Sequence, residues 1–192
     1  MTDNFDNKYS LAGKFLIASP TMNNGGIFDK SLVFVCSHGR NGAMGIVVNK
    51  RLDEFTFSDL TFQLPIENYT KLNQISLYQG GPLEKVRGLV LHTSDYVKDG
   101  TIVVSNGIAV SSSNEIIADI AFDRGPEKKL VALGYSFWQP RQLEAEIFEN
   151  YWFVADANTD LLFAASDEEK WQRAMDETKI NLERFVGITG HA

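Results

Sequence analysis

Residues 31–38, SLVFVCSH, constrain the fold of this 192-residue chain more strongly than any other segment. On an extended strand the apolar side chains divide into Leu32, Phe34 and Cys36 on one face and Val33 and Val35 on the other. A strand that is apolar on both faces is typical of the centre of a sheet that is covered on both sides. The rest of the chain must therefore supply a covering layer for each face.

A tight hairpin is predicted directly after this strand. Residues 42–50, GAMGIVVNK, predict a second strand, and the intervening GRNG has the composition of a turn. Asn41-Gly42 is its strongest signal, because both residue types tolerate the backbone angles of short hairpins. The same glycines do not predict a phosphate-binding loop, since they lead into a β-branched strand and not into a Gly-Lys-Ser/Thr helix start.

The remaining segments carry strand and helix patterns in mixed order. Strands are predicted at 14–19, 74–81, 86–94, 101–112 and 128–136, with a closing antiparallel pair at 151–157 and 161–165. Helices are predicted from Thr56 or Ser58, over 112–125, 142–150 and 166–178, with a shorter turn from Asn181. No regular βαβ repeat is present. We predict a flexible arm at 1–10 and one α+β domain over 11–192, with a mixed or mostly antiparallel sheet and a few short flanking helices.

Charge and cysteine content limit the classes of partner. A formal net charge of −7 disfavours loose attraction to nucleic acid or anionic lipid. Cys36 is the only cysteine, so no internal disulfide can form. The N-terminal MTDNFDNKYS lacks the basic start and the apolar run of a signal peptide, and no apolar run is long enough to span a bilayer. These features predict a cytoplasmic protein.

A catalytic set could be drawn from Cys36, His38, His92 and Asp95. Cys36 and His38 are two residues apart, which predicts that they share one face of a strand, and Cys-His-Asp is a known nucleophile arrangement. A cysteine inside an apolar strand, however, is more often inert packing with a raised pKa. We assign no catalytic residue. One cysteine and three histidines without paired-ligand spacing also predict no metal and no cofactor.

The densest cluster of chemically capable side chains lies within 133–146, LGYSFWQPRQLEAE. Its aromatic members are Tyr135, Phe137 and Trp138, and its polar members are Gln139, Arg141, Gln142, Glu144 and Glu146. Aromatic rings beside a short polar helix suit a pocket or an interface. Packing of the same rings into a core is the alternative. The two glutamates are two residues apart on the helix and face different directions, which argues against an acid/base pair.

Several distinct motifs follow one another along the chain. They are LAGKFLIASPTM, IFDKSLVFVCSHGRNGAMGIVVNK, QGGPL, GLVLHTS, LGYSFWQPRQLEAEI, NYWFVADA, LLF, KWQRAM and the terminal GHA. In this order and spacing they resemble the YqgE/AlgH family of bacterial proteins, almost from end to end. The pieces that carry the resemblance most strongly are Gly42-Ala43-Met44-Gly45 with Asn49, Gly80-Gly81-Pro82, and Gln142-Leu143-Glu144 with Glu146.

The resemblance implies a compact α+β fold and a cytosolic bacterial protein, without an established reaction. Some members of the family are called transcriptional regulators of exopolysaccharide production. Where relatives commonly read Gly-Trp-Gly-x-Gly before Gln-Leu-Glu, this chain has Phe137-Trp138-Gln139-Pro140-Arg141. The bulkier residues predict a stiffer loop that fills the space beside it.

Our leading hypothesis is a nonenzymatic binding or regulatory protein that engages a protein partner or a small ligand through the 134–146 loop and the 80–82 turn. The binding residues predicted are Gly80, Gly81, Pro82, His92, Tyr135, Trp138, Arg141, Gln142 and Glu146. A structural role is predicted for Gly42, Ala43, Met44, Gly45 and Asn49. Two alternatives stay open. One is a regulator that associates with DNA, which the acidic charge opposes, and the other is an enzyme that uses Cys36 or His92.

Overall fold

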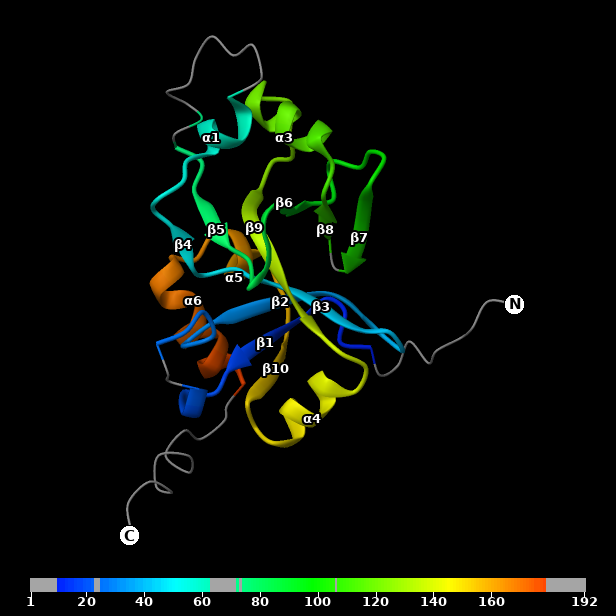
Figure 1. Cartoon of the computed structure of the whole chain (residues 1–192), viewed down its shortest axis with the longest axis vertical. Helices are drawn as coiled ribbons and strands as arrows, with labels where there is room; N and C mark the ends of the chain where they lie inside the picture. The colour runs from blue at the N-terminus through cyan, green and yellow to red at the C-terminus, as the bar shows by residue number, and fades with distance from the viewer. Residues whose placement is uncertain (1–9, 23–24, 63–71, 73, 106, 179–192) are drawn as a thin grey trace, which may run out of the picture.

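The computed structural model describes residues 10–22, 25–62, 72, 74–105 and 107–178, and within them the chain forms one domain around a curled sheet (Figure 1). The strands are β1 (Lys14–Ala18), β2 (Leu32–Gly39), β3 (Gly42–Val47), β4 (Arg51–Leu52), β5 (Leu77–Gln79), β6 (Leu83–Thr93), β7 (Thr101–Ser105), β8 (Ile108–Ser111), β9 (Lys129–Trp138) and β10 (Trp152–Asp156). The α-helices are α1 (Phe57–Thr61), α3 (Asn114–Ala121), α4 (Gln142–Phe148), α5 (Thr159–Phe163) and α6 (Asp167–Glu177), and a 3-10 helix, η2, covers Pro20–Met22.

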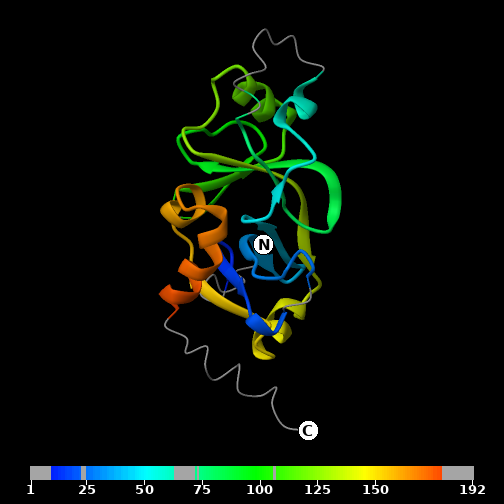
Figure 2. The same cartoon turned by 90° about the vertical axis from the view of Figure 1, so that its left-hand side faces the viewer.

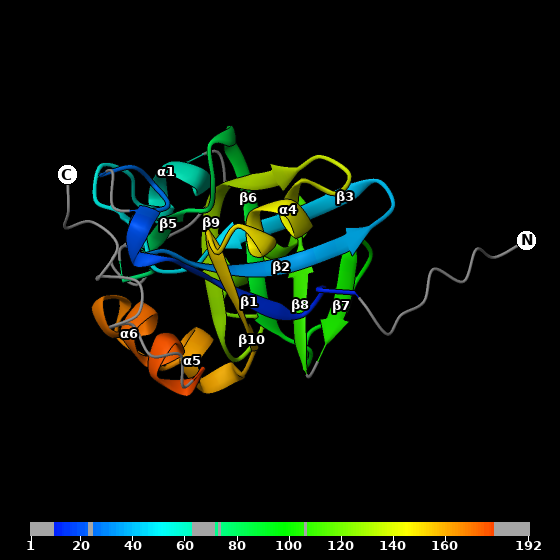
Figure 3. The ribbon, with the colours of Figure 1, turned by 90° about the horizontal axis from the view of Figure 1, so that it is seen from below.

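Strand β9 joins the two halves of the sheet. The strand order is β10-β1-β2-β3-β9-β6-β8-β7, with β4 and β5 added beside the first part of β9. Leu77–Gln79 of β5 run parallel to β9, and the other pairings are antiparallel. The sheet is therefore mostly antiparallel with one parallel pair. Figure 3 shows the curl, which brings the Ser105 hydroxyl at the end of β7 within 3.4 Å of the Gly13 carbonyl oxygen, to which it donates a hydrogen bond.

Three apolar clusters cover the sheet in the manner that the two-faced strand requires. The central cluster holds Phe34 and Cys36 of β2 and extends to α5 and α6, which lie together on one side of the molecule (Figure 2). The second cluster holds Val33 and Val35 on the opposite face of β2 and is covered by α4. The third lies on the other half of the sheet beneath α1 and α3. Both faces of β2 are thus buried, as predicted.

The β2–β3 hairpin is confirmed, but its turn lies one residue before the predicted Asn41-Gly42. Gly39 pairs with Gly42, so Arg40 and Asn41 form the connection and Gly42 begins the second strand. Gly42 has a φ of +107°, which favours glycine. Asn49 closes the far end of the hairpin, because its side chain accepts a hydrogen bond from the Leu32 N–H and donates one to the Lys30 carbonyl, each at 2.9 Å.

A β-bulge in β2 corrects one expectation. Val35 pairs with Gly45 and Ser37 with Met44, so Cys36 is the extra residue on its strand. Cys36 belongs to the central cluster, whereas His38 pairs with Ala43 of the second cluster. The prediction that Cys36 and His38 share one face is therefore wrong, because the inserted residue reverses the alternation of the side chains that follow.

The predicted closing strand pair is half right. Residues 152–156 form β10, which pairs with β1, but the segment predicted as its partner, 161–165, covers the end of helix α5 and the turn after it. The Asn158 side chain caps this helix by accepting a hydrogen bond from the Leu161 N–H at 2.7 Å. The helices predicted at Thr56, 112–125, 142–150 and 166–178 are present as α1, α3, α4 and α6. The helical turn predicted from Asn181 and residues 1–9 of the predicted arm lie outside the described residues.

Two glycines sit where β9 changes partner. The Gly80 N–H donates to the Leu133 carbonyl at 2.8 Å, and the Gly80 carbonyl accepts from the Val47 N–H at 2.8 Å. A Cβ atom on Gly81 would lie 1.9 Å from the carbonyl carbon of Tyr135. The chain can therefore cross β9 at this point only because Gly81 has no side chain.

We expect Gly81→Ala to lower the free energy of unfolding by at least about 3 kcal/mol, since the added methyl group forces the backbone away from β9. Gly88→Ala on β6 is the matched control, because no atom lies within 4 Å of its Cβ position, and it should change stability by less than about 0.5 kcal/mol. Urea unfolding of both variants measures the difference, and equal stability would contradict the close approach at Gly81.

Candidate functional site

An aromatic cleft of about 310 Å³ lies between the end of β9, α4 and the start of β10. Its aromatic side chains are Phe28, Phe137, Trp138, Tyr151 and Trp152, with Met22 and Pro82 completing the apolar wall. Its polar side chains are Ser136, Gln142 and Glu146. The cleft brings together four of the predicted binding residues, namely Pro82, Trp138, Gln142 and Glu146.

The Glu146 carboxylate organises this cleft. One of its oxygens, Oε2, accepts hydrogen bonds from the indole nitrogens of Trp138 and Trp152, each at 2.8 Å. The other oxygen accepts from the Gln142 side chain at 2.9 Å. The two indole rings meet edge to face, with centroids 5.9 Å apart and planes at 82°. A single side chain on α4 therefore fixes the rings that β9 and β10 contribute.

Strand β3 provides the space in which Trp138 is seated. A Cβ atom on Gly42 would lie 2.1 Å from the Trp138 carbonyl oxygen, and one on Gly45 would lie 3.2 Å from the Trp138 ring. Ala43 and Met44, between these glycines, pack into the second and the central cluster respectively. The GAMG motif thus packs behind Trp138. It holds the wall of the cleft and does not line it.

Ser136 has no hydrogen-bond partner in the cleft. Its side chain is 2% exposed, and its hydroxyl oxygen is buried without a partner among the described residues. An unpaired buried hydroxyl costs free energy, and native structures contain few of them. Ser136 was not predicted as a binding residue. Its position two residues before Trp138 on a strand, which places both on one face, was the signal that could have identified it.

The cleft carries a negative charge. Glu146 is the one charged side chain among the residues that line it, and its three hydrogen-bond donors are neutral. Among the described residues, no lysine, arginine or histidine forms an ion pair with it. The rim is apolar and open to solvent, since Phe137 is 41% and Tyr151 43% exposed.

The segment predicted as a binding loop is mainly regular structure. Tyr135 to Trp138 belong to β9, Gln142 begins α4, and only residues 139–141 connect them. A strand forms because Ala43 to Gly45 of β3 pair with Ser136 to Trp138, an interaction that local sequence does not reveal. The bulkier residues at 137–141 leave the cleft open.

The other predicted binding residues do not line the cleft. Gly80 and Gly81 pack against the backbone of β9, and Tyr135 donates a hydrogen bond from its hydroxyl to Glu84 at 2.9 Å. Arg141 is exposed, with a φ of +66°, and precedes α4. His92 lies on β6, in the other half of the sheet.

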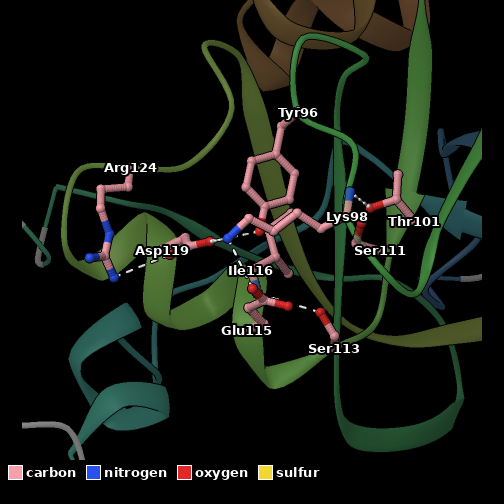
Figure 4. A network of polar contacts seen from close by, with 9 residues as sticks. All are labelled: Tyr96, Lys98, Thr101, Ser111, Ser113, Glu115, Ile116, Asp119 and Arg124. Carbon is pink, nitrogen blue, oxygen red and sulfur yellow. Dashed lines mark hydrogen bonds and ion pairs between the residues drawn. The ribbon is translucent and has the colours of Figure 1, made fainter.

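His92 is a buried neutral histidine. Its Nδ1 donates to the Thr93 carbonyl at 2.9 Å, so Nε2 is the acceptor for the Ser111 hydroxyl, also at 2.9 Å. Ser111 in turn lies 2.8 Å from the Thr101 hydroxyl (Figure 4). Burial lowers the pKa of His92, partly offset by the Thr93 carbonyl and the charge of Asp95. Both nitrogens are occupied, so neither is available as a general base in this state.

The thiol of Cys36 is also unsuited to catalysis in this state. It is buried, its hydrogen bond goes to the Phe34 carbonyl at 3.8 Å, and burial raises its pKa. Asp95 accepts hydrogen bonds from the Thr93 hydroxyl and the Glu127 N–H. Among the described residues no hydrogen bond joins Cys36 to His92, so the Cys-His-Asp set that the sequence allowed is not assembled.

Figure 4 shows a second polar network, which links the segment after β6 to α3. The Asp119 carboxylate accepts from the Tyr96 hydroxyl at 2.8 Å and from Lys98 at 2.6 Å, and Arg124 lies 3.3 Å from it. These donors lower the pKa of Asp119, while burial and the Asp119 carboxylate raise the pKa of Tyr96 to about 12. Each of these side chains has a hydrogen-bond or ion-pair partner, and we interpret the network as a structural link between this segment and α3.

A third polar cluster fastens α6 to the sheet. Lys170, although 2% exposed, donates to the Val48 carbonyl at 2.9 Å and to Asp167 at 3.0 Å. Asp167 also accepts from Arg51 at 2.9 Å and from the Tyr78 hydroxyl at 3.2 Å. Burial lowers the pKa of Lys170. Sequence reasoning missed this cluster, because its members come from three segments that are far apart in the sequence.

The described part of the chain holds neither a metal-binding cluster nor a membrane-spanning helix. Within these residues, no group of three or more His, Cys, Asp or Glu side chains is arranged to hold a metal ion. None of the described helices is both long enough and apolar enough to cross a membrane.

Comparison with known proteins places this chain in one family of bacterial proteins. The sequence model described as DUF179, AlgH-like, matches residues 15–183. A UPF0301 protein of Ruegeria pomeroyi is 42% identical over 95% of this chain and 99% of its own length. A UPF0301 protein of Rickettsia massiliae is 37% identical over 96% of this chain and 97% of its own length.

Two solved structures have a similar fold. The solution structure of the AlgH protein of Pseudomonas aeruginosa superposes with a TM-score of 0.77 at 33% identity, over 96% of this chain and 97% of that one. A protein of Corynebacterium diphtheriae has a TM-score of 0.71 at 22% identity, over 91% of this chain and 90% of that one, and so shows the fold alone. The chain belongs to the AlgH-like family, which confirms the resemblance drawn from its motifs.

We expect Glu146→Ala to lower the free energy of unfolding by about 3 kcal/mol, because the buried Trp138 and Trp152 N–H groups lose their acceptor. Glu146→Gln retains one oxygen for both indoles and should cost less than about 1 kcal/mol. Urea unfolding measures both variants. A Glu146→Ala protein as stable as the unaltered chain would show that the carboxylate does not hold the rings.

We expect the protein to lose stability as the pH falls from about 7.5 to about 5.5, with His92 contributing to the loss. The unfolded state binds a proton on His92 at its ordinary pKa near 6.5, whereas the folded state, with its lowered pKa, binds it only at lower pH. Thermal unfolding of the unaltered protein and of His92→Gln at both pH values isolates this contribution, since the other groups are shared. The variant should show the smaller decrease, and equal decreases would refute the assignment.

Proposed function

We propose that this protein is a nonenzymatic binding module, and that the aromatic cleft formed by β9, α4 and β10 receives a group from a protein partner or a small ligand. The observation that carries the proposal is the Ser136 hydroxyl, which is buried at the cleft and has no hydrogen-bond partner in the part of the chain that the structure describes. A ligand that supplies that hydrogen bond would remove the cost of leaving the group unpaired.

The surroundings of Ser136 support binding. Five aromatic rings line a space whose size lies at the lower end of the range for ligand pockets. The exposed Phe137 and Tyr151 rings would lose contact with water when the cleft is filled. Because Glu146 already fixes Trp138 and Trp152, their rings need no rearrangement to receive a group.

The same residues argue against catalysis. Among the described residues no histidine or carboxylate is hydrogen-bonded to Ser136, so none of them activates its hydroxyl as a nucleophile. The Glu146 oxygens are engaged by three donors that orient side chains. Cys36 and His92, the remaining candidates, are buried and satisfied elsewhere. A role in regulation would then be exerted by binding a partner.

The test uses the indole N–H signals of ¹⁵N-labelled protein, titrated separately with butan-1-ol, butanoate and butylammonium. We expect at least one probe to shift the Trp138 and Trp152 signals at millimolar concentration, because both indoles line the cleft. The Trp171 signal should stay in place, since its N–H donates to the Ala18 carbonyl outside the cleft.

Two variants complete this test. Ser136→Val fills the base of the cleft and removes the unpaired hydroxyl, so we expect it to retain the fold and to lose the shifts. Ser112→Val makes the same change at an exposed position beyond β8 and should keep them. If no probe moves either indole signal up to its solubility limit, the proposed binding function is wrong.

A further inference from the structure

The charge of the cleft limits what can fill it. Glu146 is its single charged group, and the donors that surround the carboxylate are two indoles and one amide. A ligand that covers this site removes water from an anion that has no cationic partner among the described residues. Burial of an unpaired charge is costly, so a neutral or anionic ligand would bind at a penalty that a cation avoids.

The rings of the cleft favour the same charge. Phe137, Trp138, Tyr151 and Trp152 offer electron-rich π systems in the cleft that Glu146 lines, and cations are attracted to the faces of such rings. The net charge of the whole chain, −7, adds a long-range field of the same sign. Local and overall electrostatics therefore both select a positively charged group.

Ser136 restricts the kind of cation. Its hydroxyl lacks a partner and can accept a hydrogen bond from an N–H group. A quaternary ammonium group has no N–H and would leave the hydroxyl unpaired. A primary ammonium group has three donors, enough for the hydroxyl and for lone pairs of Glu146 that are still open. The apolar wall formed by Met22, Phe28 and Pro82 suits the methylene stem that carries such a group.

The rim indicates that the cation belongs to a larger molecule. Phe137 and Tyr151 are partly exposed at the cleft, and Phe148, three residues before Tyr151, is 87% exposed without lining it. A free amine small enough for a space of about 310 Å³ would leave the Phe148 ring in water. A polypeptide that inserts one side chain into the cleft would cover this ring as well.

We infer that the cleft binds the ammonium group of a lysine side chain presented by a partner polypeptide. The lysine stem packs between the aromatic rings, and its ammonium group is recognised by Glu146 and Ser136. This inference rests on the proposed binding function and specifies the partner of the same site.

The test compares Nα-acetyl-lysine methylamide with Nα-acetyl-norleucine methylamide, which has the same backbone and a side chain of similar shape without the charge. Both are titrated into the ¹⁵N-labelled protein, and the Trp138 and Trp152 indole signals are followed. We expect the lysine compound to bind at least about tenfold more tightly, and the preference to shrink as salt is raised.

Variants separate local charge from overall charge. Glu146→Gln should abolish the preference for lysine, so that the lysine and norleucine compounds bind with equal affinity. Glu144→Gln is the matched control, because it removes the same charge from the same helix but at a position that contacts His38, and it should keep the preference. If Glu146→Gln fails to fold, the two compounds still decide the question on the unaltered protein.

The outcomes are distinct. Equal binding of the lysine and norleucine compounds at the two indoles would overturn the cationic partner and leave the binding function standing. Binding of butylammonium without binding of the lysine compound would show that a free amine is the ligand and would overturn the polypeptide source. A protein that responds to no probe, including the four-carbon compounds, would overturn the binding function itself.

Discussion

The structure depends on one strand that serves two halves of a sheet. The first part of β9 pairs with β5 and β6, and its last residues pair with β3, so the central cluster can run unbroken from one half to the other. The change of partner requires a segment to cross β9 closely, which Gly81 permits, and a positive φ at Gly134. The outer faces of the two halves are then separate, and each receives its own helices.

This arrangement explains where the cleft lies. In the half that contains β3, the final residues of β9 pair with β3. The chain then turns at residues 139–141 into α4. Helix α4 packs across the outer face and directs Glu146 towards the indoles of Trp138 and Trp152. The cleft is the space left between that helix and the two strands. Its negative charge arises because the residue that orients the rings is a carboxylate.

Local patterns predicted much of the fold. The two-faced β2, the hairpin with β3, helix α3 with its Ser113 cap and helix α6 with its acidic first turn all carry their signals within a few residues. Helix α5 was mistaken for a strand because Leu161 to Ala165 are apolar without a period, and the Asn158 cap decides the outcome. The bulge at Cys36 leaves no mark in the sequence. Neither does the pairing that makes Tyr135 to Trp138 a strand.

The sequence analysis identified only some of the cleft residues, because the others come from distant segments of the chain. Trp138, Gln142 and Glu146 stand close together in the sequence and attract notice, but Phe28 and Trp152 come from segments that carry no polar motif. His92 was predicted for its chemistry, and it lies buried on β6, away from the cleft. Sequence identifies residue types capable of binding, whereas only the packing of distant segments shows which of them face a common space.

The pairing of β1 with β10 joins Lys14 to Asp156 and Ala18 to Trp152, residues that are far apart in the sequence. On the ribosome, β1 emerges early and keeps an open edge until almost the whole chain has been synthesised. Trp152 is the first residue of β10, so the aromatic cleft cannot close before that edge is covered. The cleft is thus completed only after β10 has been synthesised, and a chain that terminates before β10 would expose both an unpaired strand and half of the cleft lining.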